Sequence, residues 1–138
     1  MTTDEFDPQA LLEMMPLART LGIRIDTVTR DEAVGRLAWS ADLCTAAGML
    51  HGGVLVSLAD SVAGLCAFVN LPRGASTSTI ELKTNFFAAV RDGEVVAVAR
   101  PLHRGRSVIV VQTDLYRVEP APNLRVAQVT QTQAVLMR

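Results

Sequence analysis

The chain has 138 residues, and its 13 Lys and Arg residues nearly balance its 14 Asp and Glu residues, giving a formal net charge of −1. This length, with a 49% hydrophobic content, is enough for one folded domain with its own core. The near-neutral charge argues against a nucleic-acid-binding surface, and an aromatic content of 4% argues against a stacking platform for bases or sugars.

The cysteines and histidines are few. Cys44 and Cys66 are too few for a secreted disulfide scaffold, and no charged-then-apolar signal segment opens the chain, so we expect a cytoplasmic protein. His51 and His103 lie 52 residues apart without a metal-binding spacing. We therefore expect no metal site.

The first third of the chain predicts one helix and two strands. Residues 1–7 are polar and are expected to fray, and residues 8–21 predict a short amphipathic N-terminal helix that ends at Gly22. Alternating side chains then predict strands over residues 23–28 and 33–40, joined by a tight turn.

The rest of the chain predicts a long helix and four strands. Residues 54–69 are almost entirely apolar, but the stretch is too short to span a membrane and contains Asp60, so it predicts a buried helix. Residues 120–123 are expected to form a loop that ends one strand before the last strand begins. The four strands are expected over residues 77–87, 94–102, 108–118 and 125–136.

This order of elements predicts a single α+β domain over residues 1–138. A helix that is apolar nearly all round must be covered on most sides, and a six-stranded antiparallel sheet wrapped around it is the simplest cover. Such a small sheet cannot enclose the helix completely and leaves exposed edge strands. We therefore expect self-association.

Asp60 is the only ionisable residue between Val54 and Val69. A buried, unpaired carboxylate is costly, so Asp60 must be paired, exposed at a cleft or retained for function. With Ser57, Ser61 and Gly64 it forms a narrow polar and small-residue stripe that could face a partner or a pocket. A purely structural hydrogen bond or cap is the alternative interpretation.

The second unusual feature is His51-Gly52-Gly53 at the helix entrance. The first N–H groups of a helix have no partner within the helix, and two glycines would let a ligand atom approach them closely. Such donors can stabilise a developing oxyanion on a carbonyl, each being worth about 2.7–4 kcal/mol. A simple bend is the alternative for the glycines, and His51 could either orient this entrance, which we favour, or contact substrate.

Geometry connects the two features. Gly53 and Asp60 are seven residues apart, which is about 10 Å of helical rise, so one helix cannot easily place both on one carbonyl carbon. Two antiparallel copies of the helix related by a two-fold axis could do so. We therefore predict an active site shared between two subunits.

Four segments of the sequence together match a known pattern. They are Gly48-Met49-Leu50-His51-Gly52-Gly53, Leu58-Ala59-Asp60, Thr79 to Phe86 and Gly105-Arg106. With these segments the sequence resembles a hotdog-fold acyl-CoA thioesterase of the PaaI type, in the 4-hydroxybenzoyl-CoA thioesterase superfamily, over about residues 21–136. The resemblance implies a homo-oligomer, at least a dimer and more specifically a tetramer, that hydrolyses acyl-CoA to free acid and CoA without a cofactor.

The resemblance also implies roles for individual residues. Asp60 would be the nucleophile or general base, the Gly52 N–H would polarise the thioester carbonyl, and the Thr79 hydroxyl would orient water or the carboxylate. The Gly105-Arg106 turn would lie along the pantetheine arm. The remaining substrate-binding positions would be Thr45, His51, Gly53 and Ser61.

One departure from the family keeps other functions open. Related enzymes usually carry Asn at the position of Thr45, and a hydroxyl lacks the amide donor and carbonyl acceptor of Asn. Thr45 either positions the substrate differently or weakens activity, so a non-catalytic acyl-CoA-binding module remains an alternative. An acyl-thioester hydratase or dehydratase fits less well. Candidates for an apolar acyl lining are Val54, Leu58, Phe68, Phe86 and Phe87.

Overall fold

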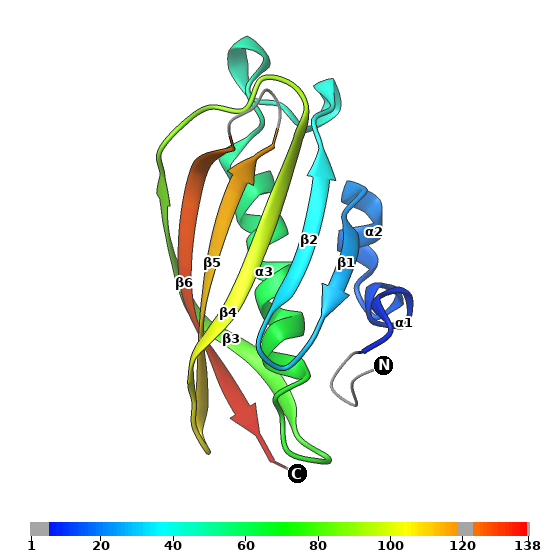
Figure 1. Cartoon of the computed structure of the whole chain (residues 1–138), viewed down its shortest axis with the longest axis vertical. Coiled ribbons are helices and arrows are strands. Elements are labelled where there is room, and N and C mark those ends of the chain that lie inside the picture. Colours follow the sequence, from blue (N-terminus) through cyan, green and yellow to red (C-terminus); the bar gives the residue numbers. More distant parts are fainter. Residues whose placement is uncertain (1–5, 119–122, 138) are drawn as a thin grey trace.

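A computed structural model describes residues 6–118 and 123–137. One long helix, α3 (Gly52–Phe68), runs along one face of a six-stranded antiparallel sheet (Figure 1). The strand order is β1-β2-β4-β5-β6-β3, with bounds β1 (Arg24–Val28), β2 (Ala33–Ala38), β3 (Ser76–Phe86), β4 (Glu94–Arg104), β5 (Val108–Arg117) and β6 (Leu124–Leu136). The expected arrangement of one central helix and six antiparallel strands is confirmed, whereas the break expected at residues 120–123 falls mostly outside the described residues.

The N-terminal region differs from the single helix expected over residues 8–21. It forms two short helices, α1 (Pro8–Glu13) and α2 (Pro16–Leu21), which lie beside β1 in Figure 1. The helix breaks because proline lacks an N–H and disfavours a helical conformation in the residue before it. Met15 accordingly has φ −124° and ψ 84°.

Gly22 and Phe6 lie at the two ends of this region. Gly22 ends α2 with a left-handed φ of 79°, as predicted. Fraying was expected over residues 1–7; residues 1–5 lie outside the described part of the chain, but Phe6 is held by its N–H, which donates to the Val28 carbonyl at 3.0 Å.

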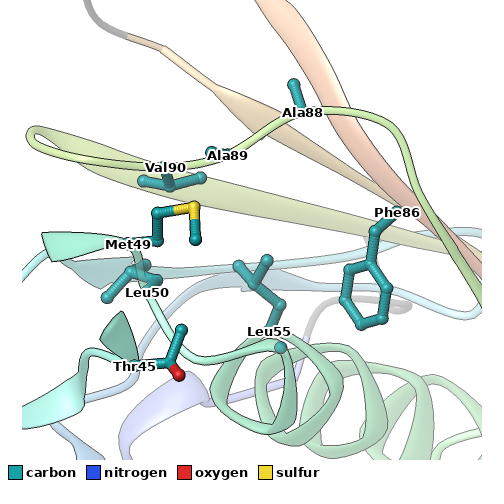
Figure 2. Close-up of a pocket in the computed structure, with 9 residues that line it drawn as sticks. Thr45, Met49, Leu50, Leu55, Phe86, Ala88, Ala89 and Val90 are labelled. Carbon is teal, nitrogen blue, oxygen red and sulfur yellow. The ribbon is translucent and has the colours of Figure 1, made fainter. Parts of the chain in front are cut away.

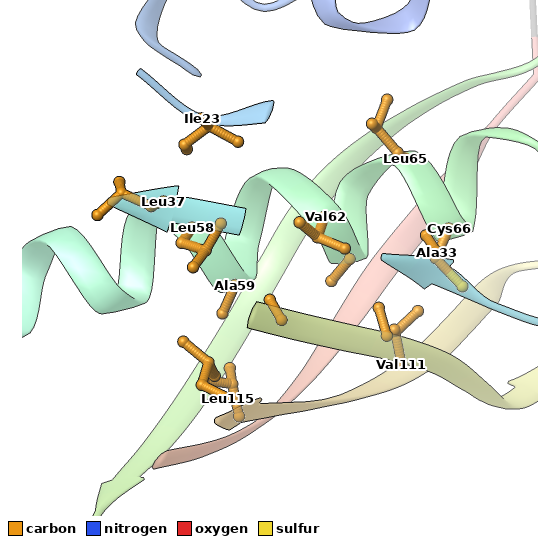
Figure 3. Close-up of a cluster of buried hydrophobic side chains, with 14 of the residues drawn as sticks. Ile23, Ala33, Leu37, Leu58, Ala59, Val62, Leu65, Cys66, Val111 and Leu115 are labelled. Atoms are coloured by element: carbon orange, nitrogen blue, oxygen red, sulfur yellow. The ribbon is translucent and has the colours of Figure 1, made fainter. Parts of the chain in front are cut away.

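The core lies between α3 and the sheet (Figure 3). Leu58 and Val62 of α3 are fully buried, and burial of each such side chain contributes about 1.5–3 kcal/mol. Gly35 of β2 lets the helix approach, because a Cβ atom there would lie only 2.7 Å from Cγ2 of Val62. The depth at which α3 sits on the sheet therefore depends on this glycine. In the described residues, no helix is long and apolar enough to cross a membrane.

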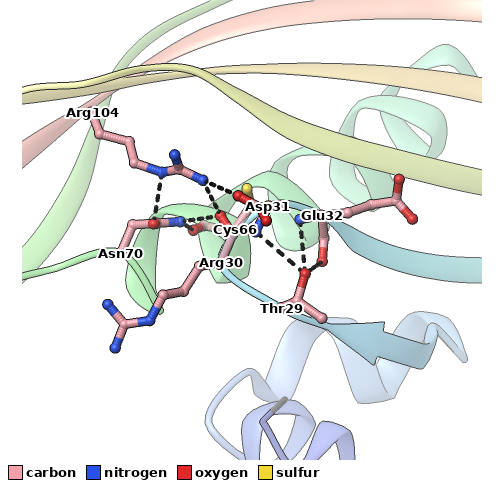
Figure 4. Close-up of polar contacts among 7 residues, drawn as sticks. All are labelled: Thr29, Arg30, Asp31, Glu32, Cys66, Asn70 and Arg104. Atoms are coloured by element: carbon pink, nitrogen blue, oxygen red, sulfur yellow. Dashed lines mark hydrogen bonds and ion pairs between the residues drawn. The ribbon is translucent and has the colours of Figure 1, made fainter. Parts of the chain in front are cut away.

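Polar contacts tie the C-terminal end of α3 to its neighbours (Figure 4). Arg104 Nε donates to Asn70 Oδ1 at 2.9 Å, and Arg104 Nη2 donates to Asp31 Oδ1 and to the Arg30 carbonyl, each at 2.7 Å. Asn70 Nδ2 donates to the Cys66 carbonyl at 2.8 Å. These contacts hold the β1–β2 turn, the helix end and the end of β4 together.

Candidate active site

The segment that leads into α3, residues 44–51, is held by long-range contacts and is called the entrance loop here. The Trp39 indole Nε1 donates to the Gly48 carbonyl at 2.9 Å, and Arg91 Nη1 donates to the Ala47 carbonyl at 2.7 Å. Within the loop the Thr45 N–H donates to the Met49 carbonyl at 2.8 Å. The start of α3 is therefore fixed by contacts from two other segments.

The two glycines at the helix entrance differ in what their N–H groups do. His51 is the N-cap of α3, and its Nδ1 accepts from the Gly53 N–H at 2.8 Å. The N–H groups of Val54 and Leu55 both donate to the His51 carbonyl. Within the described structure the Gly52 N–H has no acceptor. The Gly52 N–H is thus the free donor. The His51 side chain caps the helix and accepts the Gly53 N–H.

A pocket of about 350 Å³ lies beside Gly52 and is mostly apolar (Figure 2). It is lined by Thr45, Met49, Leu50, Gly52, Leu55, Phe86, Ala88, Ala89 and Val90. Of the five apolar residues expected to line an acyl site, only Phe86 does so. Leu58 faces the sheet in the core, and Phe68 lies exposed at the far end of α3. Sequence periodicity gave no information on how α3 is rotated about its axis.

Asp60 lies near the middle of α3, is half-buried and faces β3 and β6. Its Oδ1 accepts from the Thr79 hydroxyl at 3.2 Å and from Gln131 Nε2 at 3.0 Å. Thr79 belongs to β3 and Gln131 to β6, the neighbouring strand. The structure thus brings the predicted pair Asp60 and Thr79 together, and it gives the carboxylate the hydrogen bonds that a half-buried charge requires.

Ser61, by contrast, makes its hydrogen bond within the helix. Its hydroxyl donates to the Ser57 carbonyl at 2.7 Å, and the Ser57 hydroxyl donates in turn to the Gly53 carbonyl at 2.8 Å. The hydroxyls of both serines in the predicted stripe therefore donate to backbone carbonyls of α3 and do not bond to Asp60.

Gln131 and Gln133 were missed by the reasoning from sequence. Their side chains are 0% and 2% exposed, and they point inward with the apolar residues at alternate positions of β6, Val129 among them. Two glutamines in the inward phase of a strand signal buried amides that need partners. That signal was available in the sequence.

The Gly105-Arg106 turn lies away from the entrance of its own chain. It joins β4 to β5, and the adjacent Arg104 bonds to Asn70, just beyond the C-terminal end of α3. The turn and Gly52 therefore lie at opposite ends of α3 (Figure 1). Gly52 and Asp60 are themselves eight residues apart, or about 12 Å of helical rise.

Over residues 6–118 and 123–137, neither the metal-ligating residue types nor the buried cysteine forms a second site. The described residues contain no group of three His, Cys, Asp or Glu side chains that could hold a metal ion. Cys66 is fully buried on α3, and burial raises the pKa of its thiol to about 12. The thiol is therefore neutral near pH 7 and packs as a core side chain.

Comparison with known proteins identifies the family. A Listeria monocytogenes 1,4-dihydroxy-2-naphthoyl-CoA hydrolase is 33% identical over 96 residues, covering 70% of this chain and 78% of that protein. A Haemophilus influenzae protein is 37% identical over 68 residues, and the match spans about half of each, 49%.

Solved structures agree with this relationship. A Haemophilus influenzae thioesterase superposes with a TM-score of 0.88 at 27% identity, covering 96% of this chain and 92% of that one. The Escherichia coli PaaI protein from the phenylacetic acid degradation operon shares the fold, with a TM-score of 0.82 at 21% identity, covering 93% of this chain and 89% of that one. The family model of the thioesterase superfamily matches residues 47–122, more than half of the chain, and the protein belongs to that superfamily.

Proposed function

We propose that the protein hydrolyses acyl-CoA thioesters to the free carboxylic acid and CoA. Membership of the thioesterase superfamily supports hydrolysis of a thioester. The name of the Listeria relative, a hydrolase of an aromatic acyl-CoA, supports CoA as the thiol. The observation that carries the proposal is a hydrogen-bonded carboxylate, Asp60, on the same helix as the free N–H of Gly52.

The chemistry assigned to these groups is a simple acyl transfer to water. The Gly52 N–H would donate to the thioester carbonyl oxygen and stabilise the negative charge that develops there, an effect worth about 2.7–4 kcal/mol for one well-placed donor. Asp60 would either remove a proton from the attacking water, or attack the carbonyl carbon itself and form a mixed anhydride that a water molecule then hydrolyses to the acid. In both routes the C–S bond breaks, CoA leaves as the thiolate, and the thiolate takes up a proton released by that water.

A shared site follows from the distance within one chain. Because Gly52 and Asp60 are separated by about 12 Å along the helix, we propose that Gly52 of one subunit faces Asp60 of its partner across a two-fold axis. The exposed apolar side chains of the edge strand β3 support self-association: Ile80 is 59% and Phe86 52% exposed. We propose a homodimer at minimum, and a homotetramer as the assembly.

The pocket beside Gly52 supports an apolar acyl group. Its volume of about 350 Å³ lies at the lower end of ordinary ligand pockets. Among its lining side chains only Thr45 carries a hydroxyl, so we propose a medium-chain or aromatic acyl group with Thr45 near its polar end. The Gly105-Arg106 turn, exposed at Arg106, would contact the pantetheine arm from the partner subunit.

The test is thiol release from a panel of phenylacetyl-, hydroxybenzoyl-, short-chain and long-chain acyl-CoAs, with the native protein and Asp60→Asn. We expect turnover of at least one thioester and a loss of about 100-fold or more in the variant, since base catalysis contributes 10²–10⁴-fold. Binding of acyl-CoA without thiol release would contradict hydrolysis and leave an acyl-CoA-binding module as the function.

A further inference from the structure

We infer that Gln131 is a positioning residue that sets the orientation of the Asp60 carboxylate. The inference rests on the proposed role of Asp60 and adds to it a residue outside the motifs that carry the family resemblance. Gln131 lies on β6, is fully buried, and reaches Asp60 Oδ1 with its amide nitrogen at 3.0 Å.

The direction of this hydrogen bond is set by a chain of contacts that begins at the backbone. The Ala134 carbonyl can only accept, so the Thr77 hydroxyl must donate its single proton there, at 2.8 Å. The Thr77 oxygen then accepts from Gln133 Nε2 at 3.2 Å. The Gln133 oxygen consequently faces Gln131, whose Nε2 donates to it at 2.9 Å.

Gln131 therefore has one favourable orientation. Its two amide protons go to two acceptors, Gln133 Oε1 and Asp60 Oδ1. If the amide were flipped, its oxygen would face both acceptors and both hydrogen bonds would be lost. Ala134 is paired with Ser78 in the β3–β6 ladder, so a backbone carbonyl of the sheet sets the direction of the hydrogen bonds that end at Asp60.

The Thr79 hydroxyl does not provide an equivalent constraint. It has one proton but lies near two acceptors, Gln133 Oε1 at 2.7 Å and Asp60 Oδ1 at 3.2 Å. A donor with one proton can serve only one of them at a time, and the contact with Gln133 is the shorter. Gln131 is the donor that remains on Asp60 in either case.

Gln131 is also an expensive choice if stability alone is considered. Its Oε1 is buried, and the described residues supply it with no hydrogen-bond partner. A buried carbonyl without a partner is destabilising, whereas a methionine of similar shape would leave no polar atom unpaired. What the amide adds is the hydrogen bond that occupies Asp60 Oδ1 and leaves Oδ2 for the reaction, since the described residues place no hydrogen bond on Oδ2.

The test is a double-mutant cycle of Gln131→Met and Asp60→Asn, read as kcat and KM for thiol release. We expect Gln131→Met to lower kcat by about 10- to 100-fold with little change in KM, because a carboxylate misplaced by about 1 Å loses up to 100-fold. In the Asp60→Asn background the same substitution should have no further effect on kcat, since Gln131 acts only through the carboxylate.

Gln128→Met is the matched control. Gln128 lies on the same strand, and its Nε2 makes a comparable hydrogen bond to Asp114 Oδ1 at 3.0 Å, away from Asp60. We expect this variant to retain the wild-type kcat. If Gln131→Met fails to fold, Thr77→Val is the second variant. It removes the hydroxyl at the far end of this series of hydrogen bonds without altering Asp60 or Gln131, and it should lower kcat several-fold.

The outcomes separate this inference from the proposed function. If kcat falls strongly in Asp60→Asn but stays normal in Gln131→Met, the role of Gln131 alone is overturned. The same holds for a normal kcat in Thr77→Val where that variant replaces Gln131→Met. Equal losses from Gln131→Met in both backgrounds would also overturn it, because they would indicate a structural effect. A normal rate in Asp60→Asn would overturn both proposals.

Discussion

The close approach of α3 to the sheet predicts that Gly35→Ala destabilises the protein. A Cβ atom at this position would lie 2.7 Å from Val62 Cγ2, about 1 Å closer than carbon atoms normally approach. The Arg24 carbonyl oxygen, at 3.1 Å, limits movement on another side. Val62 is fully buried and stiff about χ1, so the helix itself must shift.

The expected loss follows from two opposing terms. Overpacking of this kind costs about 1–3 kcal/mol, and replacing glycine in the unfolded chain returns about 0.4–1 kcal/mol. We therefore expect a net loss of about 1–2 kcal/mol in the free energy of unfolding. For a chain of this size that corresponds to a fall of roughly 3–10 °C in Tm.

Thermal and guanidinium unfolding at one protein concentration will measure this loss. Gly64→Ala is the control, because a Cβ there meets nothing within 4 Å in its own subunit and alanine should stabilise the helix by up to about 1 kcal/mol. Val62→Ala removes the atom that the new Cβ would meet. The double variant should therefore be more stable, by at least about 0.5 kcal/mol, than the sum of the two single losses predicts. A Gly35→Ala protein as stable as the wild type would refute the packing argument.

Two further predictions concern the helix entrance and the buried thiol. His51→Ala should lower stability by about 0.5–2 kcal/mol through loss of the N-cap, whereas His51→Asn should restore most of it; equal melting curves for the two variants would count against the cap. Burial raises the pKa of the Cys66 thiol to about 12, so the folded state favours the neutral thiol. This preference adds to the free energy of unfolding in full below the ordinary thiol pKa, and the added stability is lost as the pH rises toward 12. Ellman's reagent should therefore titrate only Cys44 in the native protein, and Cys66→Ala should weaken the alkaline loss of stability; rapid reaction of both thiols would contradict this.

The order of helices and strands could be predicted because it depends on local periodicity. The switch from alternating to continuous apolar residues and back marked β1, β2, α3 and the later strands. Pro16 could also have predicted the break between α1 and α2, but the apolar spacing across it concealed the break. The position of Asp60 in an apolar helix predicted that it would need partners, and Thr79 is one of them.

The pocket lining and the contact of Gln131 with Asp60 depend on tertiary geometry, so the sequence alone did not predict them. The rotation of α3 about its axis decides which side chains line the pocket, and that rotation is set by contacts such as Val62 over Gly35. Gln131 reaches Asp60 only because β6 pairs with β3 in one register, which no local pattern specifies. The position of Gly105-Arg106 relative to Gly52 likewise depends on how the β4–β5 hairpin runs along α3.

Mixed oligomers test whether Gly52 of one subunit and Asp60 of its partner act together across a subunit interface. Gly52→Pro removes the free N–H, yet proline suits the first position of a helix, and His51 at φ −61° and ψ 135° already has the conformation favoured before proline. Gly52→Ala adds a Cβ but keeps the N–H, and is the matched control. Gly52→Pro and Asp60→Asn should each be inactive alone.

The decisive measurement is thiol release after equal amounts of the Gly52→Pro and Asp60→Asn chains are unfolded together and refolded. If the site is shared, half of the dimers contain both chains, and each of these has one intact site, so about a quarter of the wild-type rate should return. If both groups act within one chain, no intact site forms. A mixture no more active than the two separate variants would contradict the shared site.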